Sequence, residues 1–357
     1  MRGLRNIVQK IPDKYLNWGV AISGVLALFA CVDIETLKKI ELWNISNIAN
    51  TVYNLAPTIP GSFENIFFKV FIYALFIINV ALRIYKFTIH PTAIIINHSS
   101  FSNIQSSYDP SIVTGYTVKE RDINLVYQMS RQNIVDAIRT QDALIDAILN
   151  DCDKSTELFY YGIAHIPFIF RAGFQVGDEG MVRLLHKFRN GQPFFREISS
   201  DQDTCTARLK LSTVQNTKVS NEMLVVVATS LPVAYEDLAA FHSGNFCYEL
   251  HFEMENDSMY GFDSIDSYAA MNRLRKGILE KIRETVKEKN IMRIHMVLAT
   301  SSDFTFFLAQ GFSKNHDPEI VVYHYDRNTA VKYPWGISNI STPTNAVIRQ
   351  VAPLSNN

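Results

Sequence analysis

The sequence of 357 residues has few cysteines and no excess of charge of either sign. Its four cysteines lie far apart and form no Cys-x-x-Cys pair, which argues against a zinc ribbon and a thioredoxin-type redox motif. With 34 Lys and Arg against 35 Asp and Glu, the formal net charge is −1. The chain therefore lacks the broad positive field with which general duplex-DNA binders attract phosphates, and we expect no duplex nucleic acid as a partner.

The short motifs of the common nucleotide-dependent and metal-dependent enzymes are also missing. The chain contains no Gly-x-Gly-x-x-Gly, no Walker A sequence, no His-Glu-x-x-His, no Gly-x-Ser-x-Gly and no EF-hand loop. The nine histidines are scattered, and no pair has helical ligand spacing beside an acidic residue. We therefore expect no metal or organic cofactor, assign no catalytic residue and do not expect an enzyme.

Charged residues are scarce, at 19% against 47% hydrophobic residues, and the first 90 residues explain part of this imbalance. Two apolar runs, 16–32 and 66–83, are each long enough to be a membrane-spanning helix. Basic residues precede the first run and follow the second, so the positive-inside rule predicts a hairpin anchor over residues 1–90 with both termini in the cytoplasm. A cleaved signal peptide fits less well, because no Ala-x-Ala site follows Val32.

The second apolar run contains two polar residues, Lys69 and Asn79. Polar groups inside a membrane are candidates for a pore or for contacts between helices. Lys69 lies about one turn from the outer end, where its stem can also reach the headgroups without any role in a pore. Asn79 is nearer to the centre and is the better candidate for hydrogen bonding between helices.

From residue 91 onward the pattern alternates between strands and helices, which is typical of an α/β fold. Apolar residues with helical spacing predict long helices at 131–150 and 264–289. A polar stretch without periodicity, 201–220, predicts a linker. The predicted strands are 93–101, 123–128, 158–163, 193–198, 224–232, 294–299 and 321–325.

The order of these elements repeats along the chain. The segments 167–174 and 304–312 are both rich in aromatic residues and end in Gly-Phe, and Gly173 and Gly311 are 138 residues apart. The residues at the ends of two early strands, Ser99 and Thr229, are 130 apart. We therefore predict two fused Rossmann-like halves related by a pseudo-dyad, at 91–220 and 221–345, with a tail at 346–357.

Small polar residues follow several of the predicted strands. In open α/β sheets, ligands bind at the carboxyl ends of the strands, where helix N-termini and backbone N–H groups favour phosphate oxygens. Hydroxyl groups there can bind phosphates and aromatic rings can stack on bases, although such residues also serve as helix caps and core. Together they predict a crevice for an anionic ligand that contains bases. The candidate residues are His98, Ser99, Ser100, Phe101, Tyr161, His165, Phe168, Thr229, Ser230, Ser301, Ser302 and Phe304.

Three segments together resemble the SAVED domain, the cyclic-oligonucleotide sensor of bacterial CBASS anti-phage systems. They are residues 93–101, residues 159–180 with a Tyr-Gly strand before His-Ile-Pro and Ala-Gly, and residues 294–334 with an Ala-x-Gly helix and a Val-Tyr-x-Tyr strand. The resemblance covers roughly residues 93–340 and implies a SAVED domain of two fused CARF-like units. It also implies a cyclic di-, tri- or tetranucleotide ligand made by a partner nucleotidyltransferase.

The two apolar runs lie where many SAVED proteins have a nuclease, so the chain resembles a two-transmembrane SAVED effector. This implies an inner-membrane protein, in contact with lipid, that forms homo-oligomers when ligand binds and disrupts the membrane of an infected cell, causing abortive infection. Two helices cannot enclose a pore, so permeabilisation requires several subunits. Two other functions stay open at this stage: a membrane-tethered phosphodiesterase with His98 or His165 as general base, and a passive scaffold.

Overall fold

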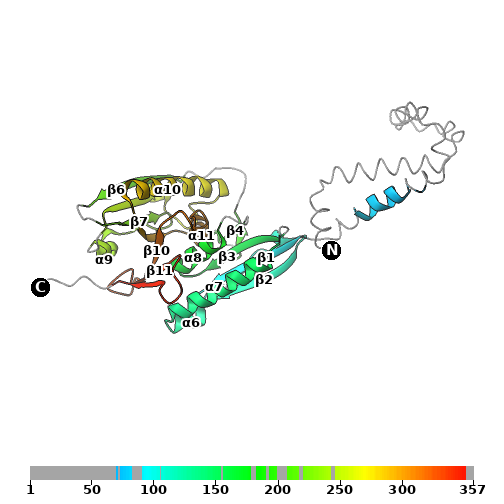
Figure 1. The fold of residues 1–357 in the computed structure, drawn as a ribbon, viewed down its shortest axis with the longest axis horizontal. Coiled ribbons are helices and arrows are strands. Elements are labelled where there is room, and N and C mark those ends of the chain that lie inside the picture. The colour runs from blue at the N-terminus through cyan, green and yellow to red at the C-terminus, as the bar shows by residue number, and fades with distance from the viewer. Residues whose placement is uncertain are drawn as a thin grey trace, which may run out of the picture. The chain divides into compact units, whose positions relative to one another are not determined.

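The computed structural model describes residues 70, 73–82, 91–104, 106–153, 156–177, 182–189, 193–198, 207–216, 220–242 and 246–350. The chain divides into two compact units, Met1–His90 and Pro91–Asn357. All the labelled strands in Figure 1 belong to the second unit.

In the first unit, the described residues 70 and 73–82 are helical, and the Asn79 side chain donates to the Leu75 carbonyl at 2.8 Å. Within the described part of the chain, no helix combines the length and the apolarity needed to cross a membrane. The predicted span at 16–32, part of the span at 66–83 and Lys69 lie outside the described residues. The membrane hairpin therefore stays a prediction.

The first sheet of the second unit has the order β2-β1-β3-β4-β5, in which the first four strands are parallel and β5 is antiparallel. β1 is a nearly continuous apolar run because both of its faces are buried, as is typical of parallel sheets. The strands are β1 (Thr92–Ser99), β2 (Thr117–Asn124), β3 (Thr156–Ile163), β4 (Val182–His186) and β5 (Arg196–Glu197). The helices of this half are η2 (Pro110–Val113), α6 (Val126–Ser130), α7 (Ile134–Asp151) and α8 (Ile166–Val176).

The second sheet has the order β12-β11-β10-β9-β7-β8-β6. Its four central strands are parallel, and β6, β11 and β12 are antiparallel to their neighbours. The strands are β6 (Leu209–Gln215), β7 (Glu222–Ala228), β8 (Tyr248–Met254), β9 (Arg293–Ala299), β10 (Glu319–His324), β11 (Trp335–Ser338) and β12 (Val347–Arg349). The helices are η3 (Tyr235–Leu238), α9 (Ala239–His242), η4 (Asp257–Met259), α10 (Tyr268–Lys289) and α11 (Ser302–Gln310).

The two halves have the same strand order, which confirms the predicted repeat of two α/β units. In each half, the second parallel strand lies on one side of the first, and the third and fourth lie on the other side. This 2-1-3-4 order is that of flavodoxin-like, doubly wound sheets. By their positions in the chain, α7 corresponds to α10 and α8 corresponds to α11.

The helices α8 and α11 pack against each other and join the two halves (Figure 1). Gly173 of α8 faces Phe306 and Ala309 of α11, and Gln310 donates to the Gly177 carbonyl at 2.8 Å near the C-terminal ends. Because Gly173 and the later Gly177 contact Phe306 and the later Gln310 in the same order, the two helices run in the same direction. Their N-termini therefore lie on the same side of the unit.

One hydrophobic core extends through both halves. It includes inner-face residues of both sheets together with residues of α7, α8, α10 and α11. Across the join, Tyr160 of β3 stacks on Phe306 of α11 with ring centroids 3.8 Å apart. One smaller cluster covers the opposite face of each sheet. The position of one half relative to the other is therefore fixed by packing.

Several predicted boundaries are wrong. The division after residue 220 does not separate the halves, because β6 precedes it and pairs with β8 of the second sheet. The predicted linker 201–220 contains β6, and the predicted tail contains β12, next to the fully buried Ala346. The predicted strand 123–128 ends at Asn124, whose side chain accepts from the Val126 N–H as α6 begins.

The alignment of the repeat also needs correction. The N-caps of α8 and α11, His165 and Ser301, are 136 residues apart, so Gly173 corresponds to Ala309. Gly311 is instead the C-cap of α11. The two Gly-Phe pairs that suggested the repeat occupy different positions in the two helices.

Candidate functional site

The N-terminus of α8 is linked to the carboxyl end of β1 through Ser100. The Ser100 hydroxyl accepts from the His165 backbone N–H at 2.8 Å and also hydrogen-bonds to His165 Nδ1. The Ser100 hydroxyl can donate to Nδ1 or accept from it, depending on the tautomer of the imidazole. In the tautomer in which Nδ1 accepts, the ring proton of His165 is on Nε2, where it can be donated to another group.

Aromatic rings from both halves surround His165. Its imidazole stacks on Phe101 with ring centroids 4.2 Å apart and contacts His324 of β10 at 4.6 Å. His324 in turn lies 4.7 Å from Trp335 of β11. Phe101, His165 and His324 are partly buried, whereas Trp335 is 8% exposed and lies behind them. We call Ser100, Phe101, His165, His324 and Trp335 the ring cluster.

The imidazoles of the ring cluster are neutral at physiological pH. Burial, together with the neighbouring His324, lowers the pKa of His165 to about 3. Burial lowers the pKa of His324 to about 4, although the Asp326 carboxylate acts in the opposite direction. Neutral imidazoles are flat and can stack, and a free N–H can donate to a phosphate or a base.

The second group of predicted residues lies at the carboxyl ends of β7 and β9 and the start of α11. Thr229 and Ser230 are buried, and both of their backbone N–H groups donate to the Ala299 carbonyl. Ser301 is the N-cap of α11 but makes no capping hydrogen bond with its side chain, and Ser302 follows as the first helical residue. The structure therefore brings the predicted hydroxyls together in two groups, one at each helix N-terminus.

A charged histidine that the sequence analysis missed lies beside the second group. His186, the last residue of β4, approaches Asp303 of α11 at 3.0 Å through Nδ1 and Asp263 at 3.1 Å through Nε2. Burial lowers the pKa of His186, but the two carboxylates outweigh burial and raise it to about 9. In the described residues, no group of three or more His, Cys, Asp or Glu side chains is arranged to hold a metal ion.

His186 and His324 occupy equivalent places in the two halves. Each is the last residue of the fourth parallel strand of its half, and each contacts the first turn or N-cap of the central helix of the other half. A signal for both was present in the sequence, since both of these strands end in histidine. Trp335 and Asp263 had no such signal, because their roles depend on contacts between distant segments.

Four of the predicted site residues lie in the interior or on the opposite face of the first sheet. His98, Phe168 and Phe304 are fully buried, and His98 Nδ1 hydrogen-bonds to the Tyr160 hydroxyl at 3.0 Å. Tyr161 faces the opposite side of the first sheet, in the cluster with Phe195. Phe168 and Phe304 face the core from α8 and α11, and the strand residues His98 and Tyr161 point into the interior because side chains alternate between the two faces of a strand. Ser99 is partly buried at the end of β1.

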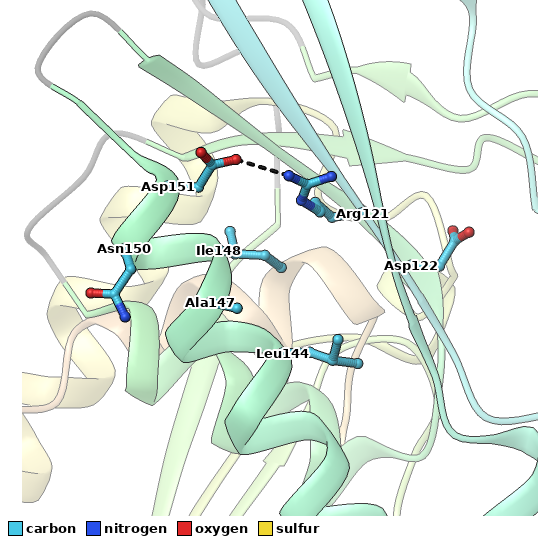
Figure 2. Close-up of a pocket in the computed structure, with 7 residues that line it drawn as sticks. All are labelled: Arg121, Asp122, Leu144, Ala147, Ile148, Asn150 and Asp151. Atoms are coloured by element: carbon cyan, nitrogen blue, oxygen red, sulfur yellow. Dashed lines mark hydrogen bonds and ion pairs between the residues drawn. The ribbon is translucent and has the colours of Figure 1, made fainter.

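A hollow of about 500 Å³ lies elsewhere, between α7 and β2. Figure 2 shows the residues that line it. Leu144, Ala147 and Ile148 line its apolar side, and Arg121 pairs with Asp151 at 2.9 Å across it. None of the predicted site residues lines this hollow. Its charges are paired with each other and it lies at a sheet edge, so we do not assign the ligand to it.

Comparison with known protein families identifies the fold. The model of the family described as "SMODS-associated and fused to various effectors sensor domain" (SAVED) matches residues 140–338, more than half of the chain. This chain belongs to the SAVED family. The matched residues of this SAVED chain include His165, His186 and His324 but begin after Ser100 and Phe101. None of the curated proteins is similar enough to match the chain.

Among solved structures, this SAVED chain is similar to the Acinetobacter baumannii Cap4 SAVED/CARF-domain containing receptor with the cyclic trinucleotide 2′3′3′-cAAA, at 13% identity and a TM-score of 0.48. The match covers 74% of this chain and 58% of that receptor. The same receptor with 3′3′3′-cAAA matches at 13% identity, with a TM-score of 0.47 and coverage of 73% and 58%. The Moraxella osloensis Cap4 receptor matches at 14% identity, with a TM-score of 0.38 and coverage of 73% and 56%.

Proposed function

We propose that the second unit of this chain is a CBASS sensor that binds a cyclic oligonucleotide where the N-termini of α8 and α11 face the same side of the unit. The observation that supports this most directly is the ring cluster. It joins the strand ends of the first half, through Ser100 and His165, to those of the second half, through His324 and Trp335. A ligand bound there contacts both halves at once.

The chemistry of the site suits a ligand with bases and phosphates. Partly buried rings offer faces on which bases stack, and such stacking contributes about 1–3 kcal/mol per base. The N-termini of two helices favour anions through their dipoles. Binding of duplex DNA would need a broad basic surface, for which a formal net charge of −1 gives no support.

The site favours binding over hydrolysis. A general base works best when its pKa lies near the operating pH. Burial lowers the pKa of both His98 and His165 to about 3, so each is a weak base at neutral pH. His98 is also fully buried and bonded to Tyr160. These observations support a sensor rather than the alternative of a tethered phosphodiesterase.

The proposed function includes an effector step at the inner membrane. The apolar runs 16–32 and 66–83 support a hairpin anchor with both termini in the cytoplasm. A partner nucleotidyltransferase supplies the ligand, the liganded chains assemble into homo-oligomers, and the gathered hairpins permeabilise the membrane of an infected cell. The ligand drives this change only if it binds the assembled state more tightly than the separate chains.

The full chain, reconstituted in dye-loaded vesicles, tests this proposal. We expect one ligand among cyclic di-, tri- and tetranucleotides, including 2′3′3′-cAAA and 3′3′3′-cAAA, to bind and release dye. Ser100→Ala and His324→Ala should weaken binding about tenfold or more, the equivalent of roughly 1.4 kcal/mol. Tyr161→Phe, on the opposite face of the sheet, is the control and should bind normally. Linear products would favour an enzyme, and equal binding by all variants would remove the ring cluster as the site.

A further inference from the structure

The carboxylate of Asp263 occupies a pair of hydrogen-bond donors at the carboxyl end of β4. One oxygen accepts from His186 Nε2 at 3.1 Å, and the other accepts from the Arg189 backbone N–H at 2.9 Å. A charged imidazole N–H and a backbone N–H that converge on two oxygens of one anion form the kind of site that binds a phosphate. In this structure the chain supplies the anion itself.

A buried carboxylate keeps this site ready for an anion. Asp303 is 4% exposed and accepts from His186 Nδ1 at 3.0 Å, so its negative charge stabilises the charged imidazole from within the protein. The other ring nitrogen, Nε2, is then a donor at neutral pH. Lys187 and Arg189 follow His186 directly, so the segment 186–189 carries three positive groups.

Asp263 belongs to a short, partly exposed segment. The Asp263 side chain is 34% exposed, against 4% for Asp303. Its neighbour Phe262 is 39% exposed and stacks under the Arg189 guanidinium at 3.6 Å, and the Ser264 hydroxyl donates to the Thr229 carbonyl at 3.1 Å. We call residues 262–264 the strap. An external anion can replace Asp263 at modest cost, because the carboxylate it releases is already partly hydrated.

We infer that the strap is a displaceable internal anion: His186 Nε2–H and the Arg189 N–H form a phosphate subsite that Asp263 fills at rest and a phosphodiester of the ligand fills when bound. This inference rests on the proposed function, because it assigns one phosphate of that same cyclic oligonucleotide. Binding then releases the strap from His186 and breaks the hydrogen bond from the Ser264 hydroxyl to the Thr229 carbonyl, which follows β7. Ligand binding is thereby coupled to a change in the surface of the second half.

The position of the subsite agrees with a single ligand that also reaches the ring cluster. His186 lies against the first turn of α11, as His324 lies against the N-cap of α8. These two helices run in the same direction, so the subsite and the ring cluster lie toward the same side of the unit. The ring cluster, built from both halves, therefore supplies stacking rings and a neutral pair of histidines, and the end of β4 in the first half supplies a charged donor pair for phosphate.

The test measures the affinity of the full chain for the cyclic oligonucleotide that the vesicle experiment selects. Asp263→Ala removes the internal competitor and should tighten binding about tenfold, since the binding-competent state no longer has to displace a carboxylate. His186→Gln should weaken binding about tenfold or more. Asp266→Ala is the matched control, because Asp266 is an exposed carboxylate three residues further along, and it should leave the affinity unchanged.

Amide hydrogen exchange of the wild-type chain gives a second readout that does not depend on any variant. We expect exchange in residues 261–264 to rise when ligand binds. If the wild type binds ligand but Asp263→Ala binds equally and the strap exchanges as before, the inference is wrong while the proposed sensor stands. If no cyclic oligonucleotide binds the wild type, the proposed function fails and the inference fails with it.

Discussion

Four histidines at the centre of the second unit show how burial and charge together set protonation. Burial lowers the pKa of His98 and His165 to about 3 and that of His324 to about 4. His186 is buried too, but Asp303 and Asp263 raise its pKa to about 9. The first three are therefore neutral groups for packing and stacking, and the fourth is a permanent cation at neutral pH.

Because His186 is charged in the fold, the free energy of unfolding should fall as the pH becomes alkaline. Its folded pKa is above the unfolded value of 6.5, so the stabilisation is fully present below about pH 6.5 and is lost as the pH rises through about 9. A shift of this size corresponds to something on the order of 3 kcal/mol. Between pH 7 and 10, the thermal midpoint of the wild type should fall more steeply than that of His186→Gln. If the thermal midpoints of the two proteins fall in parallel over this pH range, the charge of His186 does not contribute to stability.

At the scale of elements, the contact between α8 and α11 decides how the two halves fit together. A Cβ on Gly173 would lie 2.3 Å from the Phe306 carbonyl oxygen, which is backbone of the facing helix. Only a residue without a side chain allows this approach. The same contact holds both helix N-termini on one side of the unit, so it positions the ring cluster and the phosphate subsite.

Gly173→Ala should therefore destabilise the fold by roughly 1–3 kcal/mol, because the backbone of α8 or α11 has to move to make room. Gly277→Ala in α10 is a matched control. A Cβ there meets nothing within 4 Å, and alanine in an open helix position should stabilise the helix by up to about 1 kcal/mol. Urea unfolding of the two variants measures the difference. Equal changes in the free energy of unfolding for the two variants would show that the close approach of α8 and α11 does not limit the size of residue 173.

The strands that could be predicted from the sequence are those with long, nearly unbroken apolar runs, whereas the buried but short or mixed strands β4, β8 and β11 were not predicted. β1, β3, β7, β9 and β10 were predicted within a few residues because their runs of Ile, Val and Leu are buried in the parallel sheets. The edge strands β2, except for residues 123–124, and β6 were not predicted because their residues are mainly exposed, and charged or polar residues are common at the edges of sheets. A pattern of alternating hydrophobicity cannot form where neither face is buried.

The candidate site could be predicted in part. Ser100, Phe101 and His165 follow strands of one half, so the rule that ligands bind at strand ends was sufficient to find them. His324 and Trp335 join them only through the packing of one half on the other, which no local pattern reports. The strap depends on contacts between residues 186 and 263, which are 77 apart in the sequence.

At the scale of the whole molecule, the second unit contains two halves with the same strand order and different side chains at equivalent positions. The equivalent histidines His324 and His186 end equivalent strands, yet one belongs to a neutral ring cluster and the other to a charged cluster with two carboxylates. Because the two halves differ at these positions, they present different surfaces to a neighbouring chain. When such chains associate head to tail, the contacts are heterologous and build rings or filaments, which is the kind of assembly that the proposed effector step requires.

The fluorescence of Trp335 reports whether the ligand binds at the ring cluster, where residues of the two halves meet. The sequence has three tryptophans, so Trp18→Phe combined with Trp43→Phe leaves Trp335 as the sole reporter in the full chain. Titration with the selected cyclic oligonucleotide should change its emission with a midpoint that agrees with the calorimetric affinity, and His324→Ala should shift that midpoint to higher concentration. Calorimetric binding without any change in Trp335 emission would contradict the account and place the ligand outside the ring cluster.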